Sequence, residues 1–255
     1  MKKISLVLLA SASLVLTSGA ATNFAARVVA YDPGLGYAAG FTNAPAALGE
    51  PSRLDPYASP IEPFNPPYGT NQIVSLGEGG SLTVKFARPV YNAPRQPFGL
   101  DFIIFGNSGF IITNDFNPVT YEWLGPPATD GSMFANNPGL TRVSVSADGV
   151  RFFLLDTNLA PVVDGLFPTE GSGNFAVPVN PALTADDLAG ATQDDLRSVY
   201  RGSGGGTGYN INWARTRHGQ RVHLPYIRFV RVEVLSGKAE IDGFSATARP
   251  VRRVK

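Results

Sequence analysis

The chain has 255 residues, with 21 lysines and arginines against 20 aspartates and glutamates, so its formal net charge at neutral pH is +1. This balance gives no electrostatic argument for nucleic-acid binding, which relies on blocks of basic residues. The sequence has no cysteine, which excludes disulfides, cysteine nucleophiles and cysteine-ligated zinc. We therefore expect a hydrophobic core to hold the fold together, and 28 glycines and 21 prolines favour turns over helices.

The first twenty residues predict a secretory signal peptide. Lys2 and Lys3 precede an apolar run at residues 4–15, and Ser18 and Ala20 fit a small-residue cleavage site. The apolar run is short for a membrane-spanning helix. We therefore expect a secreted, periplasmic or cell-surface protein whose mature part, residues 21–255, has no membrane span.

Strand-like segments recur along the mature chain between turn signals. They are short runs rich in β-branched and aromatic residues, bounded by Gly, Pro, Asn or Asp. Eight such runs indicate an antiparallel all-β protein. The predicted strands are residues 27–31, 72–76, 81–86, 100–105, 141–146, 150–155, 226–235 and 239–246.

Two pairs of these strands are predicted to form hairpins. Asp148-Gly149 separates the strands at 141–146 and 150–155, and this dipeptide suits the positive-φ positions of a tight turn. The sequence Ser-Gly-Lys at 236–238 predicts a second hairpin between the last two strands.

One segment, residues 184–200, predicts a helix. Thr184 is a suitable N-cap, and two aspartates follow it in the first turn. Two long connections, residues 32–71 and 106–140, are rich in Pro, Gly and Asn but contain aromatic residues, which argues against simple disorder. We expect a single domain over residues 21–255: an antiparallel β-sandwich (jelly roll) with long loops and one short helix.

Residues suited to catalysis are sparse. The two histidines, His218 and His223, match no common zinc spacing, and no G-x-S-x-G motif occurs. Glycoside hydrolysis would need two converging carboxyl groups, and the sequence does not show which acids converge. The loop carboxylates open to that role are Asp101, Asp115, Glu122, Asp130 and Glu170.

Oxygen-bearing side chains suggest a structural calcium ion, which takes six to eight oxygen ligands with loose geometry. Glu240 and Asp242 lie two residues apart on the last strand, so they share a face. Asp32 ends the first strand, which often neighbours the last strand in a sandwich. The predicted ligands are Asp32, Asp101, Asn107, Glu240 and Asp242. The alternative is that these side chains cap turns or accept hydrogen bonds from backbone amides.

Aromatic side chains beside polar ones are suited to binding sugar rings. Tyr209, Asn210, Asn212 and Trp213 form one such cluster. A second cluster is Tyr121 and Trp123. Packing of Trp213 in the core is the alternative interpretation of the first cluster.

Five segments give the chain a family resemblance. The segments "VSVSADGVRFFLL" and "IRFVRVEVLSGKAEIDGFSA" resemble discoidin-like, galactose-binding-like jelly rolls. The opening "YDPGLGYAAGFTNAPAALGEP", with residues 74–86 and 98–110, is similar to uncharacterised bacterial exported proteins, many of which carry PEP-CTERM cell-surface sorting signals.

The resemblance implies a β-sandwich, an extracytoplasmic location, glycan or surface binding, and a structural calcium near the terminal strands. It implies no known reaction. The sequence ends "VRRVK", without a Pro-Glu-Pro motif and apolar helix, so we expect release or periplasmic residence rather than sorting by that route.

Three functions follow from these patterns. We expect a non-catalytic module that binds a glycan or another extracellular surface ligand. The alternatives are an enzyme that acts on extracellular polysaccharide through loop carboxylates, and a structural component of a matrix or surface layer. The sequence predicts no oligomeric state.

Overall fold

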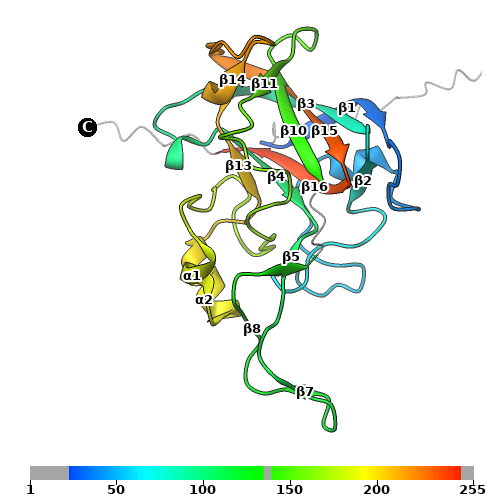
Figure 1. Ribbon diagram of the computed structural model, residues 1–255, viewed down its shortest axis with the longest axis vertical. Helices are drawn as coiled ribbons and strands as arrows, with labels where there is room; N and C mark the ends of the chain where they lie inside the picture. The colour runs from blue at the N-terminus through cyan, green and yellow to red at the C-terminus, as the bar shows by residue number, and fades with distance from the viewer. Residues whose placement is uncertain (1–22, 135–138, 248–255) are drawn as a thin grey trace, which may run out of the picture.

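The computed structural model describes residues 23–134 and 139–247 (Figure 1). The predicted signal peptide and the basic C-terminal end lie outside the described residues. The predicted fold class is confirmed: the regular secondary structure of the described residues is mostly strand, in antiparallel sheets, with two short α-helices. No helix in these two described ranges is long and apolar enough to cross a membrane.

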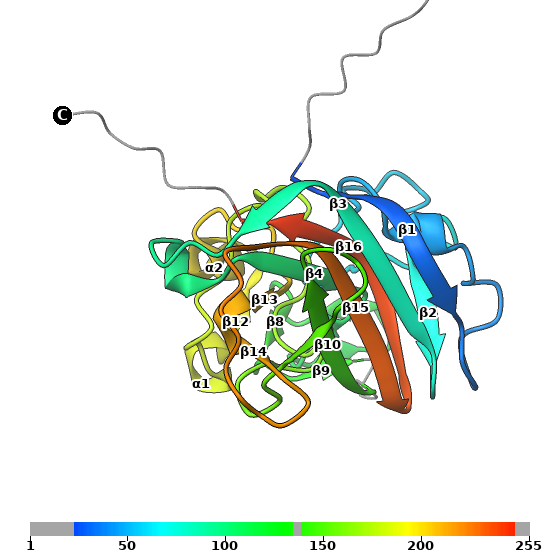
Figure 2. The ribbon, with the colours of Figure 1, turned by 90° about the horizontal axis from the view of Figure 1, so that it is seen from above.

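Two sheets form the sandwich, and Figure 2 shows them from above. The larger sheet has the strand order β1 (Ala25–Asp32), β3 (Ser81–Tyr91), β15 (Tyr226–Ser236), β10 (Leu140–Ser146), β11 (Phe153–Leu155) and β14 (Ala214–Arg215). The smaller sheet has the order β13 (Thr207–Tyr209), β4 (Phe102–Gly106), β16 (Lys238–Ala246) and β2 (Val74–Gly77). All eight predicted strands are present, with ends shifted by up to five residues.

The main core lies between these two sheets. Alternate residues of β3, such as Leu82 and Val84, are buried in one cluster with residues of the smaller sheet such as Ile241. This is the period of two that a strand imposes on its side chains. Burying each large aliphatic side chain contributes about 1.5–3 kcal/mol.

Strand β4 is buried on both faces. Phe102 and Ile104 join the main core, whereas Ile103 and Phe105 face the other way and pack with Phe175. This accounts for the unbroken apolar run of β4, because a strand covered on both sides does not alternate with polar residues. The cover is a layer of connections, so the long loops are part of the packed structure.

The first predicted hairpin is confirmed. Strands β10 and β11 pair with Ser144 opposite Leu154. The Oδ1 atom of Asp148 accepts hydrogen bonds from the backbone N–H groups of Val150 and Arg151, both at 2.8 Å. The acidic side chain therefore closes the turn that the Asp-Gly signal predicted.

The second predicted hairpin is wrong. Strand β15 pairs with β3 and β10 in the larger sheet, whereas β16 pairs with β2 and β4 in the smaller sheet. Gly237, at φ 70°, turns the chain sharply from one sheet into the other. A tight turn alone does not distinguish pairing within one sheet from crossing between two, and here burial of both apolar faces decided the outcome.

The single predicted helix is also corrected to two. Helix α1 (Ala185–Leu188) ends before Gly190, which has φ 73°, and helix α2 (Gln193–Tyr200) begins after Thr192. Both Thr184 and Thr192 form capping boxes, with Asp187 and Asp195 three residues on. Between the helices, β12 (Ala191–Thr192) pairs with β8 (Ala128–Thr129). The second cap and the glycine restart the helix in a new direction.

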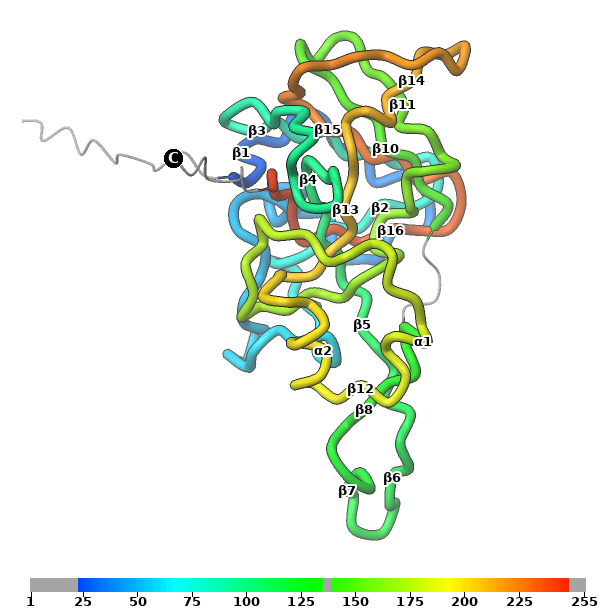
Figure 3. Tube along the Cα trace, turned by 90° about the vertical axis from the view of Figure 1, so that its left-hand side faces the viewer, coloured from blue at the N-terminus to red at the C-terminus, as the bar shows by residue number. Residues whose placement is uncertain are grey.

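Short elements fill the connections. Their arrangement leaves the β6–β7 hairpin projecting from the body, at the end of the molecule away from β14 (Figures 1 and 3). These elements are η1 (Ala44–Ala47), η2 (Pro97–Gly99), β5 (Gly109–Phe110), β6 (Phe116–Asn117), β7 (Glu122–Trp123), β9 (Met133–Phe134) and η3 (Ile211–Trp213).

Candidate ligand-binding site

The candidate site lies at the edge of the larger sheet, where β14 is the outermost strand. Arg215 of β14 pairs with Leu154 of β11, and the short helix η3 precedes it directly. The backbone N–H of Asp156 donates a 2.9 Å hydrogen bond to the carbonyl of Trp213. Residues 211–215 are therefore fixed to the sheet, which makes this edge a rigid support for exposed side chains.

A hollow of about 540 Å³, which we call the Trp213 pocket, opens at this edge. Trp213 is half-buried, and part of it packs against the main core. The pocket thus joins one anchored aromatic ring to polar and cationic side chains. Its lining residues are Leu159, Asn212, Trp213, Arg215, Arg221, Val222 and His223.

Asn212 has a structural contact as well as a place in the pocket. Its amide group and that of Asn92 exchange hydrogen bonds of 2.8 and 3.0 Å. The Nδ2 atom of Asn92 also donates to the carbonyl of Leu224. Through Asn92, these bonds link Asn212 to Leu224, the two ends of the segment 212–224. They therefore fix the position of the chain on both sides of the pocket.

A second hollow of about 670 Å³, the Arg142 groove, lies on the other side of Arg215. Arg142 donates two 3.1 Å hydrogen bonds to the carboxylate of Glu233. Arg215 makes a similar pair with Asp156, at 3.1 Å from Nε and 3.0 Å from the terminal nitrogen. The groove is therefore lined by ion pairs, whereas the described residues that line the Trp213 pocket include no carboxylate.

The other members of the predicted aromatic cluster are placed differently. Tyr209 is fully buried, stacks on Phe102 at 5.2 Å, and donates to the carbonyl of Pro161. Asn210 caps η3, because its Oδ1 accepts from the N–H of Asn212 at 2.7 Å. Both residues support the site from beneath and do not line the pocket.

Tyr121 and Trp123 lie in the β6–β7 hairpin, far from the Trp213 pocket (Figure 1). Phe116 contacts both rings, with ring centroids 6.4 and 5.0 Å away. Tyr121 is 80% exposed and has φ 58°. The two predicted clusters are therefore separate surfaces.

The five predicted calcium ligands do not come together in the structure. Asp32 accepts a hydrogen bond from the N–H of Gly34 at the end of β1. Asp101 is buried and accepts from the N–H groups of Ala93 and Ile211, at 3.0 and 2.8 Å. Burial raises the pKa of Asp101 to about 6.

Asp242 is likewise buried. Its two oxygens accept from the N–H and the hydroxyl of Ser52, at 2.8 and 2.7 Å. Burial raises the pKa of Asp242 to about 7, because the charged form has lost its water. These hydrogen bonds attach the loop at Ser52 to the smaller sheet. This is the backbone-binding role that the sequence left open.

Asn107 and Glu240 do meet, with Nδ2 of Asn107 2.5 Å from Oε2 of Glu240. A third side chain beside them, Asp164, was not predicted. Its carboxyl accepts from the N–H groups of Asn107 and Ser108, at 3.0 and 2.9 Å, and from the Ser108 hydroxyl at 2.7 Å.

The carboxyl group of Asp164 is enclosed, although the residue as a whole is half-exposed, and burial raises its pKa to about 7. Gly106 makes room for it, since a Cβ at Gly106 would lie 2.2 Å from the carboxyl carbon. The Asp-Gly pair at 164–165 was the available signal in the sequence, and Asp164 has φ 61°. Among the residues at 23–134 and 139–247, no three His, Asp or Glu side chains are grouped to hold a metal ion.

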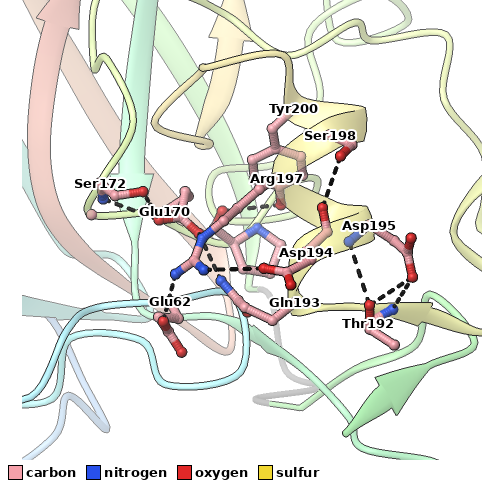
Figure 4. A network of polar contacts seen from close by, with 12 residues as sticks. Glu62, Glu170, Ser172, Thr192, Gln193, Asp194, Asp195, Arg197, Ser198 and Tyr200 are labelled. Carbon is pink, nitrogen blue, oxygen red and sulfur yellow. Dashed lines mark hydrogen bonds and ion pairs between the residues drawn. The ribbon is translucent and has the colours of Figure 1, made fainter. Parts of the chain in front are cut away.

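A network of polar contacts surrounds Arg197 of α2 (Figure 4). Its guanidinium lies 2.6 Å from Glu62 and 3.3 Å from Glu170. Glu170 also accepts from Gln193 at 2.8 Å and from the N–H of Ser172 at 3.0 Å. The carboxylates of Glu62 and Glu170 therefore both pair with the guanidinium of Arg197. We interpret this network as a structural link between the loops that carry the two glutamates and helix α2.

The loop carboxylates considered for hydrolysis are dispersed. Asp101 and Glu170 are buried and hydrogen-bonded at different places, and Asp130 accepts from Ser132 in its own turn. Asp115 and Glu122 belong to the β6–β7 hairpin segment, since the carbonyl of Asp115 accepts from the N–H of Leu124.

No family model matches the chain, and a search of curated proteins gives no significant match.

Proposed function

We propose that this protein is an exported β-sandwich module that binds an extracellular saccharide in the Trp213 pocket. One observation carries the proposal: a half-buried tryptophan, anchored in the core, forms part of a 540 Å³ hollow with polar side chains around it. The apolar face of a sugar ring packs on such a ring, while its hydroxyl groups bond to amide, imidazole and guanidinium groups.

The sequence supports the same function independently. The signal-peptide pattern of residues 1–20 favours a location outside the cytoplasm. The resemblance to exported PEP-CTERM-related proteins and to galactose-binding-like jelly rolls adds an expectation of glycan or surface binding. We propose binding without catalysis, because the described lining of the pocket lacks the carboxyl pair that glycoside hydrolysis uses.

Substituting alanine for Trp213 is expected to weaken saccharide binding at least tenfold, because it removes the ring that packs on the sugar. Binding is measured by affinity electrophoresis and calorimetry against cellulose oligomers, xylan, dextran, polygalacturonate and alginate. The matched control is Trp123→Ala, which removes the other tryptophan of the sequence from the distant hairpin.

The control should bind like the wild-type protein. A thermal melt of each variant establishes that Trp213→Ala is folded at the assay temperature. Binding that survives Trp213→Ala and is lost in Trp123→Ala would move the site to the β6–β7 hairpin. Absence of binding to every saccharide would contradict the proposed function.

We also propose the Asn107–Glu240–Asp164 group as the place where a structural calcium would bind. It brings two carboxyl groups and the side-chain amide of Asn107 together beside the last strand. Under this proposal, chelation lowers the melting temperature by several degrees, because a ligand at 100 times its Kd stabilises the fold by about 2.7 kcal/mol.

The calcium effect is tested by melts with EDTA and with added Ca²⁺. Glu240→Ala should abolish the difference between the two melts, whereas Glu122→Ala, on the exposed hairpin, should leave it intact. Identical melts with and without calcium would contradict this metal site and leave the three side chains as a hydrogen-bonded latch.

A further inference from the structure

Although the net charge of the chain is close to zero, its charged residues are unevenly distributed along the sequence. Between Asp195 and Glu233 the sequence contains seven arginines and both histidines, and no acidic residue. The middle of this segment, residues 212–223, supplies most of the lining of the Trp213 pocket. The candidate site is therefore much more basic than the molecule as a whole.

A short turn brings Arg215 and Arg221 to the Trp213 pocket and places Arg217 in the adjoining Arg142 groove. Arg215 and Arg221 face each other in an antiparallel bridge, and the N–H of Thr216 donates to the carbonyl of Gln220 at 2.8 Å. The intervening residues, Arg217 and His218, are exposed at the end of the turn. Arg221 and His223 lie on the returning strand and line the pocket with Trp213.

Two of the three arginines at this turn have no carboxylate partner. Arg215 is neutralised by Asp156, and in the neighbouring groove Arg142 is neutralised by Glu233. In contrast, within the described ranges neither Arg221 nor Arg217 forms an ion pair, and the Nε of Arg217 donates to Nε2 of His218 at 3.0 Å. Exposed arginines without acidic partners retain their full capacity to bind an anion.

The chemistry of these groups selects the ligand. A guanidinium offers paired N–H donors that match the two oxygens of a carboxylate or sulfate group. Trp213 adds an apolar face for the ring that carries the anion. Nucleic acid also carries anions, but its phosphates are contacted by basic residues spread over a wide surface. Here one arginine without an ion pair, Arg221, lies in an aromatic pocket, and a second, Arg217, lines the adjoining groove.

We propose that the Trp213 pocket binds an acidic saccharide, one whose rings carry carboxylate or sulfate groups. Arg221 contacts those groups inside the pocket, and Arg217 contacts them from the adjoining Arg142 groove. This inference rests on the proposed function and specifies its ligand class. It predicts that charge on the sugar, and not the sugar backbone alone, determines affinity.

The test uses pairs of polymers that differ only in charge. Polygalacturonate is compared with its fully methyl-esterified form, and dextran sulfate with dextran, by calorimetry at 50 and 300 mM NaCl. The acidic member of at least one pair should bind at least tenfold more tightly than its neutral partner. Its affinity should fall with salt, because binding releases counterions.

Two variants locate the contact. Arg217→Gln and Arg221→Gln should each weaken binding of the acidic polymer several-fold and reduce its salt dependence. Arg27→Gln is the matched control, because Arg27 is exposed on β1, the opposite edge of the same sheet. This control should bind like the wild-type protein.

The outcomes separate this inference from the proposed function. Equal or tighter binding of the neutral polymers would overturn the acidic ligand class and leave the saccharide function standing. Binding of neither member of either pair, or of the wider saccharide panel, would overturn both. Preference for the acidic polymer that is unchanged in Arg217→Gln and Arg221→Gln, or equally tight binding of single-stranded DNA, would also overturn the inference.

Discussion

Replacing Arg197 with methionine is expected to lower the free energy of unfolding by about 3–5 kcal/mol, the usual cost of leaving a buried charge without its partner. The side chain of Glu170 is only 3% exposed, and Arg197 is the cation beside it (Figure 4). Methionine keeps much of the length of the arginine stem but removes the guanidinium. The measurement is equilibrium urea unfolding, in which the midpoint falls with an unchanged slope.

Asp194→Ala is the matched control for this prediction. Asp194 also pairs with Arg197, at 3.4 Å, but its side chain is 92% exposed. Its removal should change stability by no more than about 0.5 kcal/mol, because exposed ion pairs contribute little. The double variant Arg197→Met/Glu170→Gln should recover a large part of the loss. A loss that Glu170→Gln does not recover would show that packing, and not the unpaired carboxylate, explains the effect.

Raising the pH from 4 to 8 is expected to destabilise the protein by several kcal/mol. Burial raises the pKa of Asp101 to about 6, and the pKa values of Asp164 and Asp242 to about 7. In the unfolded chain these groups have a pKa near 3.8. The folded state therefore binds more protons in this window, so its stability is greatest below pH 4 for these groups and is lost as the pH rises to about 7.

Other aspartates affect the stability of the protein in a lower pH range. Backbone hydrogen bonds from Arg151 and Val150 lower the pKa of Asp148, and hydrogen bonds from Thr184 lower that of Asp187. Their contribution to stability is lost only as the pH falls below about 4. Stability should therefore be greatest near pH 4–5 and decline toward neutral pH. Urea unfolding over this range checks the sign of the slope.

Asp242→Asn isolates one of the three groups. Asparagine imitates the protonated carboxyl, since its oxygen accepts from the Ser52 N–H while its amide donates to the Ser52 hydroxyl. The variant should match the wild type near pH 4 within about 1 kcal/mol and be more stable at pH 8, by about 3 kcal/mol. A variant whose stability follows the wild-type pH dependence in parallel would contradict the assignment.

Much of the fold could be predicted from the sequence, because strands and turns are local. The runs that form β3, β10, β15 and β16 have their own residue preferences and bounding glycines, and Asp148-Gly149 carries its turn geometry with it. The pairing of strands is not local. At Gly237 the same turn signal led into the opposite sheet, and only the need to bury two apolar faces distinguishes the two outcomes.

The candidate site was predictable in part. Trp213 and Asn212 line a pocket, as expected for an aromatic and polar cluster. Tyr209 lies in β13, pairs with Phe102 of β4 and is buried in the core. The direction of a side chain in a three-residue strand depends on its register with β4, which the sequence does not specify. Arg217 and Arg221 were not among the predicted site residues, because their lack of acidic partners depends on which residues surround them in the folded structure.

The most direct measurement for the central claim uses the fluorescence of Trp213. The sequence has two tryptophans, so Trp123→Phe leaves Trp213 as the only one. Titration of this variant with the saccharide panel should produce a saturable change in emission with at least one polymer, because the ring that contacts the sugar loses water. The reciprocal variant, Trp213→Phe, should show no change in the emission of Trp123. Unchanged emission of Trp213 with every polymer, or a change in the emission of Trp123 instead, would contradict saccharide binding at the Trp213 pocket.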